Sequence, residues 1–511
     1  MRLSALLSKI NIEEIVQPAF QEGRTGPADP FITSLAYDSR EVTEGSLFFA
    51  LKGLHVDGHR FIGQAIGKGA AAVVCMEIPE IIDPRISYVR VADSRTVMSP
   101  IAADYYGHPS LEMVVIGVTG TDGKSTTSYF IQQLLRKSGK KTGLLTTVQF
   151  DLGSSSSKNY LRQSTPEATE IHRLLWQMRN NGCTHAVVEA TSHGLSPRNN
   201  RLGDVRFDTG VLTNISHEHL DFHKTLEQYI DDKANLFRAL PAEGGCAVVN
   251  LDEPRRNAFE QAAECPVFTY SLTDGSADLY AADIRPLTGE KSGGQEFTLV
   301  HAGERSELTL PLTGRFNVEN CLAALLAVSS RPGEDLATYL PFVGDLEAIR
   351  GRMVPVQQGQ PFQVIVDYAH TPGSFRKLFP SLRSQVEGKL IAVFGSAGER
   401  DIDKRSIQGK IASEFCDIII LADEDPRGEE PLQILEDIAE GCRGMERGKN
   451  LLLIEDRPAA IRTAFSMAGK DDLVILLGKG HEGSIIYADG PVPWDEEQEA
   501  IKALRESGYQ I

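Results

Sequence analysis

The stretch Met113-Val114-Val115-Ile116-Gly117-Val118, followed after Thr119 by Gly120-Thr121-Asp122-Gly123-Lys124-Ser125-Thr126, decides the fold of this chain. The apolar run predicts a buried strand, the glycines predict a tight turn, and residues from about 124 to 137 predict a helix that stops at Gly139. Strand, glycine-rich loop and helix in this order are typical of a phosphate-binding unit, because the glycines let backbone N–H groups converge on phosphate oxygens.

Two side chains of this loop have the chemistry that a bound nucleotide needs. We expect Lys124 to lie against the β- and γ-phosphates and Ser125 to coordinate Mg²⁺. The usual loop pattern has a glycine where this chain has Val118, so the match is incomplete. The alternative is a plain strand-to-helix turn with an exposed lysine, and the strong strand and helix on either side argue against it.

Further alternating elements predict an α/β protein with mainly parallel sheets and helices on both faces. A buried strand at His185–Glu189 ends in a carboxylate, whereas the serine-rich segment Gly153–Lys158 predicts a flexible surface loop. Later strand candidates are Leu390–Phe394, Ile418–Leu421, Leu451–Ile454 and Leu473–Leu477. A chain of 511 residues is too long for one core, and we expect domains at residues 1–110, 111–330 and 331–511.

Composition narrows the class of protein. The net charge of −18 disfavours nucleic acid as a partner, because the protein as a whole repels polyphosphate. The sequence shows neither a bilayer-spanning apolar stretch nor a signal-peptide core, and it predicts no membrane insertion. The seven cysteines are scattered without a CxxC pair, which predicts reduced thiols in the cytoplasm.

A second candidate site follows the phosphate loop. Glu189 stands at the end of an apolar strand, where it would face a metal-bound nucleotide rather than bulk solvent. Three histidines follow, in Ser216-His217-Glu218-His219-Leu220-Asp221-Phe222-His223. Their spacing differs from HExxH and no cysteine is near, so we favour Mg²⁺ with oxygen ligands and one histidine over zinc. His217 is interpreted as an ordinary loop residue.

These motifs resemble the Mur ligases of peptidoglycan synthesis, most of all the MurE type. The resemblance covers nearly the whole chain and includes six motifs in order. They are Asp38-Ser39-Arg40 with Gly45–Ala50, the phosphate loop, Glu189–Leu195 with Thr213–Phe237, Gly314–Asn320, Gly351–Met353 with Asp367–Pro372, and Gly478–Glu482. The resemblance implies a central P-loop parallel-sheet domain between an N-terminal UDP-substrate domain and a Rossmann-like C-terminal domain that binds an amino acid.

The resemblance also assigns residues to ATP and Mg²⁺. It places Gly120, Thr121, Asp122, Gly123, Lys124, Ser125, Thr126, Asn317 and Arg352 at the nucleotide. It implies Ser125, Glu189, His219 and Lys233 as metal ligands and Lys124, Glu189, His219 and Lys233 as catalytic residues. Lys233 matches a lysine that the family carbamylates, which would turn a cation that repels metals into an anion that binds them. Asp122 stands where the family usually has asparagine.

Substrate residues are assigned in the same way. Those expected at the UDP-linked dipeptide are Tyr37, Ser39, Ser164, Thr165, Thr191, Asn199 and Arg201. Thr191-Ser192 replaces a Ser-Ser pair, and residues 196–201 are about two longer than the family segment, in which Asn199 and Arg201 align with a Gln-x-Arg pair. Those expected at the incoming amino acid are Arg400, Glu424, Asp425, Pro426, Arg427, Gly478 and Glu482.

The charges in this last group bear on the amino acid. The diaminopimelate-specific type carries Asp-Asn-Pro-Arg where this chain has Glu424-Asp425-Pro426-Arg427. An ionised Asp425 accepts hydrogen bonds only, so it should repel a distal carboxylate and attract a distal ammonium. Arg427 and Arg400 act in the opposite direction unless Arg427 pairs with Asp425. The charges favour lysine or ornithine, with meso-diaminopimelate close behind.

The resemblance thus implies a monomeric cytoplasmic ligase that forms an acyl phosphate with ATP and then joins a diamino acid to a UDP-N-acetylmuramoyl dipeptide. A folate polyglutamate synthetase shares this chemistry but lacks the N-terminal domain with Asp38-Ser39-Arg40. A P-loop switch protein would not need Lys233 or Gly478–Glu482. A dinucleotide-binding oxidoreductase is suggested only by Gly395-Ser396-Ala397-Gly398, without Gly-x-Gly-x-x-Gly.

Overall fold

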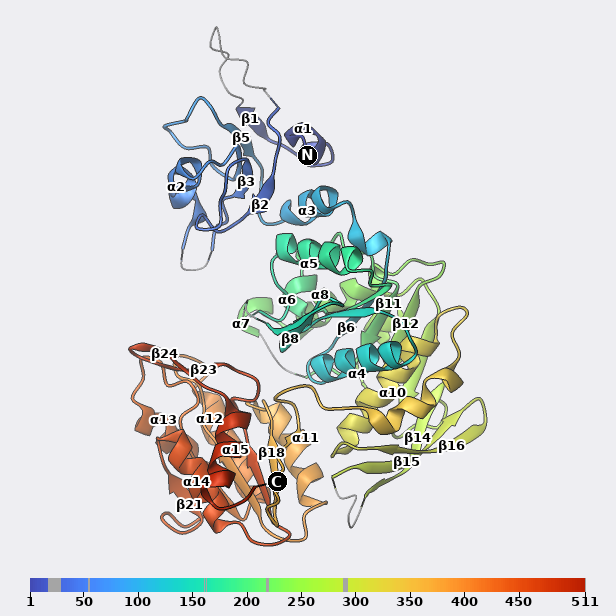
Figure 1. Cartoon of the computed structure of the whole chain (residues 1–511), viewed down its shortest axis with the longest axis vertical. Coiled ribbons are helices and arrows are strands. Elements are labelled where there is room, and N and C mark those ends of the chain that lie inside the picture. Colours follow the sequence, from blue (N-terminus) through green and yellow to red (C-terminus); the bar gives the residue numbers. More distant parts are fainter. Residues whose placement is uncertain are drawn as a thin grey trace.

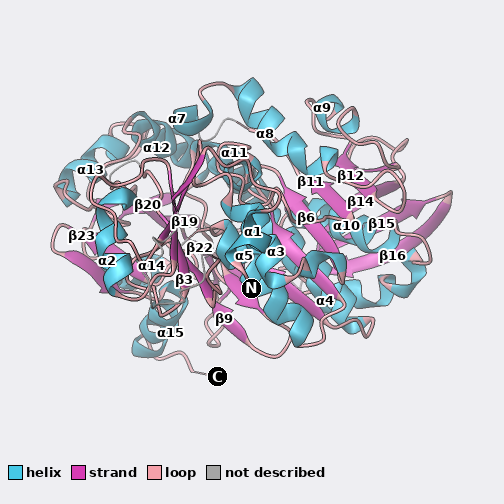
Figure 2. Cartoon of the chain, turned by 90° about the horizontal axis from the view of Figure 1, so that it is seen from above, coloured by secondary structure: helices cyan, strands magenta, loops and turns pink. Residues whose placement is uncertain are grey.

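A computed structural model describes residues 1–16, 29–53, 56–159, 161, 163–216, 220–287 and 293–510. These residues form three large sheets, each from one continuous part of the chain, together with a short hairpin. Figure 1 shows the first sheet at the top, the central sheet below it and the third sheet at the lower left. In the view from above, helices lie on both sides of the strands (Figure 2).

The first sheet has the strand order β1-β5-β4-β3-β2, with β1 antiparallel to β5 and the other neighbours parallel. Its strands are β1 Glu14–Val16, β2 Ser34–Ala36, β3 Ser46–Phe49, β4 Ala72–Cys75 and β5 Ser87–Arg90. The helices of this part are α1 Leu3–Leu7, η1 Gly58–Phe61, α2 Ile62–Gly67, α3 Met98–Tyr106 and η2 Pro109–Leu111. β3 and β4 are buried along their whole length, so they form the centre of this core.

The central sheet has the order β16-β15-β14-β13-β12-β11-β6-β10-β7-β8-β9. Its strands are β6 Val114–Thr119, β7 Thr142–Leu145, β8 Gln149–Asp151, β9 Ser156–Lys158, β10 His185–Glu189, β11 Thr209–Leu212, β12 Cys246–Asn250, β13 Val267–Ser271, β14 Leu279–Pro286, β15 Gln295–His301 and β16 Glu304–Leu310. The helices are α4 Lys124–Lys137, α5 Ala168–Asn180, α6 Ser192–Leu195, α7 Leu220–His223, α8 Leu226–Arg238, α9 Asn257–Glu260 and α10 Arg315–Ser329.

The strand and helix that flank the phosphate loop form as the sequence predicts. β6 is hydrogen-bonded between β10 and β11, both parallel to it, and α4 covers residues 124–137. Helices α4 and α10 pack on one face of the sheet, and α5 and α8 pack on the other. Because the strands around β6 are parallel, their carboxyl ends meet at the edge where the loop lies.

Two parts of the central sheet differ from the prediction. Strands β14, β15 and β16 extend the sheet as antiparallel neighbours, where the sequence predicted further alternating units. The serine-rich segment Gly153–Lys158 was predicted to be a loop, but its end forms β9, paired with β8. The β9 side chains are exposed, so backbone pairing to an open sheet edge holds this strand rather than burial.

The third sheet has the order β17-β18-β22-β19-β20-β21, parallel except for β17. Its strands are β17 Val354–Pro355, β18 Gln363–Val366, β19 Leu390–Phe394, β20 Ile418–Leu421, β21 Leu451–Leu453 and β22 Leu473–Leu476, and the hairpin is β23 Ser484–Tyr487 with β24 Gly490–Pro493. The helices of this part are α11 Pro372–Arg383, α12 Asp403–Phe415, α13 Pro431–Ala439, α14 Arg457–Met467 and α15 Glu496–Glu506. The short helices η4 Leu336–Thr338 and η5 Leu340–Asp345 instead pack in the core of the central sheet, with α4 and α10.

Helices cover both faces of the third sheet. One apolar cluster joins the sheet to α11, α12 and α13, and the other joins it to α14 and α15. All seven cysteines of the chain are buried and free. None of the helices within the described ranges is long and apolar enough to cross a lipid bilayer.

A buried ion pair ties α14 to α15 in the third part. The Arg457 guanidinium lies 2.6 Å from the Glu496 carboxylate, and neither side chain is exposed. Glu496→Ala should lower the free energy of unfolding by about 3–5 kcal/mol, because it leaves a buried cation without its partner. Chemical denaturation followed by circular dichroism measures the change.

The matched control for this prediction is Glu506→Ala. Glu506 pairs with Arg462 between the same two helices, but both side chains are partly exposed. Its loss should cost about 1 kcal/mol or less. Equal effects of the two substitutions would contradict the structural role assigned to Arg457 and Glu496.

Candidate active site

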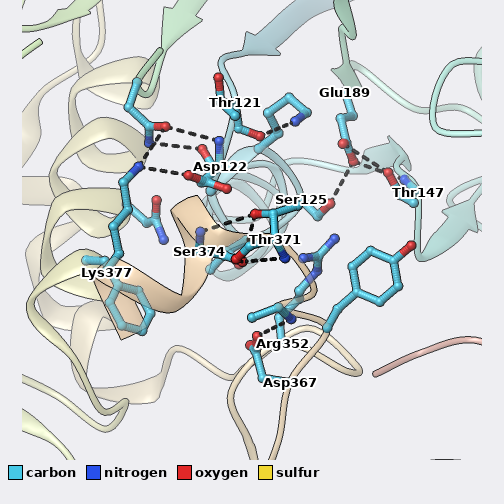
Figure 3. Close-up of a pocket in the computed structure, with 18 of the residues that line it drawn as sticks. Thr121, Asp122, Ser125, Thr147, Glu189, Arg352, Asp367, Thr371, Ser374 and Lys377 are labelled. Atoms are coloured by element: carbon cyan, nitrogen blue, oxygen red, sulfur yellow. Dashed lines mark hydrogen bonds and ion pairs between the residues drawn. The ribbon is translucent and has the colours of Figure 1, made fainter. Parts of the chain in front are cut away.

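A cavity of about 300 Å³ lies where the carboxyl ends of β6 and β10 meet the beginning of α4. Residues 352–378 of the third part line its opposite side, so two sheets contribute to one pocket. Figure 3 shows Thr121, Ser125 and Glu189 facing Arg352, Thr371 and Lys377 across this space. Of the predicted nucleotide and metal residues, those that line it are Thr121, Asp122, Gly123, Lys124, Ser125, Thr126, Glu189, Lys233, Asn317 and Arg352.

The backbone of the loop requires glycine at two positions. Gly120 has φ 141°, and an added Cβ would lie 1.9 Å from Thr213 Oγ1. Gly123 has φ 82°, and its Cβ would lie 2.4 Å from Asn320 Oδ1. Lys124, the first residue of α4, turns back so that its Nζ donates to the Thr121 carbonyl at 2.6 Å. The loop therefore forms a tight turn at the amino end of α4, the place where helices bind anions.

Glu189 is 2% exposed and is held by donors from two elements. The Ser125 hydroxyl donates to Glu189 Oε2 at 2.8 Å, and the Thr147 backbone N–H donates to the same oxygen at 3.0 Å. The Thr147 hydroxyl donates to Oε1 at 3.0 Å. The Ser125 hydroxyl and the Glu189 carboxylate thus form a compact pair of oxygen donors, the ligand type that Mg²⁺ prefers.

Lys233 is buried, although lysine side chains usually face solvent. Its side chain is 2% exposed, and Nζ donates to the Gly120 carbonyl at 2.6 Å. The ammonium also lies 4.5 Å from the centre of the Tyr229 ring, whose hydroxyl is 2.9 Å from Thr121 Oγ1. A helix of the central part, α8, therefore brings a lysine directly beneath the phosphate loop.

The third part contributes a polar wall. The Arg352 guanidinium stacks over the Tyr368 ring at 4.5 Å, and its Nε has no hydrogen-bond partner within the described ranges. Asp367 accepts from the Met353 and Ala369 backbone N–H groups at 2.8 and 2.7 Å. Burial raises the pKa of Asp367 above its ordinary value. Asn317, on α10 of the central part, donates to the Thr313 carbonyl at 2.8 Å.

Three family models match the chain in order. The models are described as the catalytic domain of the Mur ligase family over residues 31–106, the Mur ligase middle domain over residues 118–328, and the Mur ligase glutamate ligase domain over residues 351–480. A UDP-N-acetylmuramyl-tripeptide synthetase from a Roseiflexus species is 46% identical over 98% of this chain and 100% of its own length. The chain is a Mur ligase of the MurE type.

Other comparisons agree with this assignment. A UDP-N-acetylmuramoyl-L-alanyl-D-glutamate–2,6-diaminopimelate ligase from Halalkalibacterium halodurans is 37% identical over 94% of this chain and 95% of its own length. A solved structure of a ligase with the same printed name is 29% identical, with a TM-score of 0.65, and covers 96% of this chain and 98% of that one. This Mur ligase is an ATP-dependent enzyme that joins an acid to an amino acid, and its α/β architecture of three sheets is that of the family.

The residues predicted for the UDP-linked substrate extend from the cavity toward the first sheet. Ser164 lines the cavity, Thr191 Oγ1 donates to Thr165 Oγ1 at 2.9 Å, and Thr165 Oγ1 donates to the Glu189 carbonyl at 3.0 Å. Arg201 donates to the Thr165 carbonyl and to Glu167, each at 2.8 Å. Asn199 instead donates to the His193 carbonyl at 3.0 Å. Through Thr165, the residues predicted to bind the UDP-linked substrate therefore contact Glu189.

Tyr37 and Ser39 lie in the first part of the ligase and do not line the cavity. The Ser39 hydroxyl donates to Gln64 Oε1 at 2.9 Å. Burial, with the nearby carboxylates Glu170 and Glu167, raises the pKa of Tyr37 to about 12. Arg95 of the same part donates to Glu167 at 2.5 Å, so Glu167 accepts from both Arg95 and Arg201. Glu167 therefore joins the first part to the predicted substrate segment.

The residues predicted for the amino acid gather at the carboxyl edge of the third sheet. Pro426 and Arg427 follow Glu424 and Asp425 beyond β20, Gly478 follows β22, and Arg400 is exposed beyond β19. Glu424 is 6% exposed, and its Oε2 has no hydrogen-bond partner within the described ranges. A Cβ on Gly478 would lie 2.5 Å from that oxygen, so only glycine leaves Glu424 this space. Burial raises the pKa of Glu424.

Asp425 is not the available negative charge that the sequence predicted. Asp425 is paired neither with Arg427 nor left open to a substrate, because Lys479 Nζ donates to Asp425 Oδ1 at 2.7 Å and to Glu482 Oε2 at 2.5 Å. The Ile486 backbone N–H also donates to Asp425 Oδ1, at 3.0 Å. Lys479, whose side chain is fully buried, was not among the residues predicted for the amino acid. Among the described carboxylates at this edge, Glu424 is the one with a buried oxygen that lacks a hydrogen-bond partner.

Sequence reasoning missed several residues of the site. Thr147 follows β7 in a segment without a motif, and Lys377 lies in the middle of α11, where a lysine usually faces solvent. His223, left open by the sequence, is buried, with Nδ1 2.8 Å from Asp232 and Nε2 3.0 Å from Ser192. The predicted metal ligand His219 and its neighbour His217 lie outside the described residues.

Two residues that line the cavity should each be needed for activity. Lys124→Ala and Glu189→Gln should each reduce kcat/KM about 100-fold or more, because each removes a charge from the cavity beside the phosphate loop. The thermal unfolding midpoint should change little for Lys124→Ala, since its Nζ bonds only within the loop. Lys137→Ala, at the exposed end of α4, is the matched control. Near-normal turnover of either site variant at saturating ATP would remove that residue from the site.

Proposed function

We propose that this Mur ligase adds a diamino acid to the D-glutamate residue of UDP-N-acetylmuramoyl-L-alanyl-D-glutamate during peptidoglycan precursor synthesis. The observation that carries the proposal is the cavity in which the phosphate loop, Glu189 and Lys233 of the central part face Arg352 of the third part. The activities printed for the relatives support it. We also propose that the enzyme works as a cytoplasmic monomer, with no role for nucleic acid or membrane insertion.

Each part of the chain has its own role in this proposal. Residues 1–110 hold the UDP end of the substrate, residues 111–330 hold ATP, and residues 331–511 hold the incoming amino acid. The contact of Arg95 and Arg201 with Glu167 supports the path of the first substrate, from Tyr37 and Ser39 toward Glu189. The hydrogen bond of 3.3 Å from the Tyr368 hydroxyl to Glu482 supports a path from the amino-acid edge to the cavity.

The first step is phosphoryl transfer. An oxygen of the substrate carboxylate attacks the γ-phosphorus of ATP, the bond to the β-phosphate oxygen breaks, and ADP leaves. During this transfer Lys124 no longer contacts the Thr121 carbonyl and instead stabilises the charge on the phosphoryl oxygens. Ser125, Glu189, His219 and Lys233 would hold Mg²⁺, and the oxygens of Ser125 and Glu189 fit that ion. Bound Mg²⁺ would neutralise part of the phosphate charge.

The second step is amide formation. The amine of the diamino acid attacks the carbonyl carbon of the acyl phosphate, inorganic phosphate leaves, and the nitrogen loses a proton. Water would hydrolyse the acyl phosphate, so the site must exclude it. The wall formed by Arg352, Tyr368 and α11 supports this role, because it covers the cavity from the third part.

Lys233 has the position that a carbamate needs. As an ammonium it binds the Gly120 carbonyl and adds positive charge beside the metal ligands. The ammonium first loses one proton; addition of CO₂ to the neutral Nζ then forms a carbamate and releases a second proton, which places an anion with two oxygens in the same place. The burial of Lys233 at 2% exposure supports protection of such a labile group from water.

Lys233→Ala should therefore be inactive and should regain part of its activity with short carboxylates, which can occupy the space of the carbamate. The assay is ADP release at increasing formate or acetate concentration. Lys224→Ala, a lysine outside the cavity lining, is the control and should gain nothing from the added anions. Full activity of Lys233→Ala without additive would remove the lysine from the mechanism.

We propose that Glu424 receives the distal ammonium of the amino acid. Its unpartnered oxygen at the carboxyl edge of the third sheet supports this, because a buried polar atom without a partner is costly unless a ligand satisfies it. Arg427 Nε likewise has no hydrogen-bond partner among the described residues and can bind a carboxylate. Lysine and ornithine would use Glu424 alone, whereas meso-diaminopimelate would use both residues.

An assay of ADP release with the UDP-linked dipeptide and lysine, ornithine or meso-diaminopimelate tests the function. Without release by any of the three, the proposed reaction is wrong. Glu424→Gln should shift preference from lysine toward meso-diaminopimelate by about fivefold or more, because the carboxylate proposed to receive the distal ammonium is lost while Arg427 remains for the distal carboxylate. Asp489→Asn, in the exposed β23–β24 turn, is the matched control. An unchanged ratio would contradict a role of this charge in selection.

A further inference from the structure

Asp122 of the phosphate loop forms an ion pair with a lysine of the third part. Lys377 Nζ lies 2.8 Å from Asp122 Oδ2 and 3.1 Å from Asn214 Oδ1. Lys377 belongs to α11, whose first residues line the opposite wall of the nucleotide cavity. Figure 3 shows Lys377 extending from α11 toward Asp122. The pair therefore joins the loop of one sheet to a helix of another.

The backbone of Asp122 has little freedom to move its carboxylate away from the loop. Its carbonyl accepts from Thr213 Oγ1 at 2.7 Å and from Asn214 Nδ2 at 3.2 Å. Its N–H donates to Asn214 Oδ1 at 3.1 Å. These three bonds anchor the residue between the two glycines of the loop, so its negative charge stays beside any phosphate bound there.

A fixed carboxylate in a phosphate-binding loop is electrostatically unfavourable, because it repels the polyphosphate that the loop must bind. Lys124 and Arg352 also face the cavity, but the cation that contacts Asp122 is Lys377. Burial by itself raises the pKa of Asp122, yet the charge and hydrogen bond of Lys377, together with the charges of Lys124 and Arg352, outweigh it and hold the pKa below the ordinary value. Asp122 is therefore ionised and needs its partner most when phosphate is present.

The ion pair between Asp122 and Lys377 is too exposed to contribute much to the stability of the fold. The two side chains are 33% and 45% exposed, and ion pairs with that much access to water contribute little to folding. Loss of Lys377 should thus leave the fold intact. The ion pair should instead affect nucleotide binding, because a bound polyphosphate adds several negative charges beside Asp122.

We propose that Lys377 is a positioning residue that neutralises Asp122 and holds α11 over the phosphate loop, so that the nucleotide polyphosphate binds tightly only when this pair has formed. The inference rests on the proposed nucleotide site. It gives the third part a direct influence on nucleotide affinity, in addition to its proposed role in binding the amino acid.

A double-mutant cycle tests the proposal through binding rather than activity. The affinity for ADP with Mg²⁺ is measured by calorimetry for the wild type, Lys377→Met, Asp122→Asn and the double variant. Lys377→Met should weaken ADP binding about fivefold or more when Asp122 is present, and about twofold or less when Asn replaces it. Lys377→Arg should restore most of the affinity, because it keeps the charge. Lys410→Met, at an exposed position of α12, is the control and should bind like the wild type.

Three results would overturn the proposal. If Lys377→Met loses the same factor in both backgrounds, Lys377 acts without Asp122. If it loses nothing beside Asp122, the pair has no function in binding. If Lys124→Ala binds ADP as the wild type does, the nucleotide site itself is wrong and this inference fails with it. Circular dichroism of each variant, with Lys377→Gln as a second neutral replacement, separates loss of affinity from loss of structure.

Discussion

The tight turn between β6 and α4 is the constraint on which the site depends. Gly120 and Gly123 adopt positive φ values and leave no room for a Cβ, because Thr213 and Asn320 pack directly against them. That packing fixes where the loop's backbone N–H groups point, and it also fixes the Gly120 carbonyl that Lys233 contacts. Residues far apart in the sequence are therefore positioned by one short piece of backbone.

The cavity is lined by charges of both signs. Lys124, Lys233, Lys377 and Arg352 face a cavity that also contains Asp122 and Glu189. Several of these charges bind each other or the backbone in this structure, as Lys377 binds Asp122 and Lys233 binds Gly120. A nucleotide must replace some of these contacts. At the proposed nucleotide site, phosphate binding and the contact of the third part with the loop would be coupled, because both use the same side chains.

The amino-acid edge of the third sheet shows how tertiary structure changes the meaning of a motif. The sequence predicts that Asp425, between Glu424 and Arg427, is a negative charge available to a substrate. In the structure, Lys479 reaches it from the segment after β22, and Glu424 is left with the unpartnered oxygen. Parallel strands bring the ends of β20 and β22 together, and that proximity is invisible along the chain.

The sequence by itself determined the family, the phosphate loop, helix α4 and most strands of the third sheet, because local apolar runs and glycine positions act over a few residues. It also identified Lys124, Ser125, Glu189 and Lys233 as a group, through motifs that the cavity then brings together. Only the tertiary structure decided that Ser156–Lys158 is a strand, that Thr147 holds Glu189, that Lys479 neutralises Asp425 and that Lys377 reaches Asp122. These contacts depend on sheet edges and on helices from another part of the chain, and no local pattern encodes a distance across two sheets.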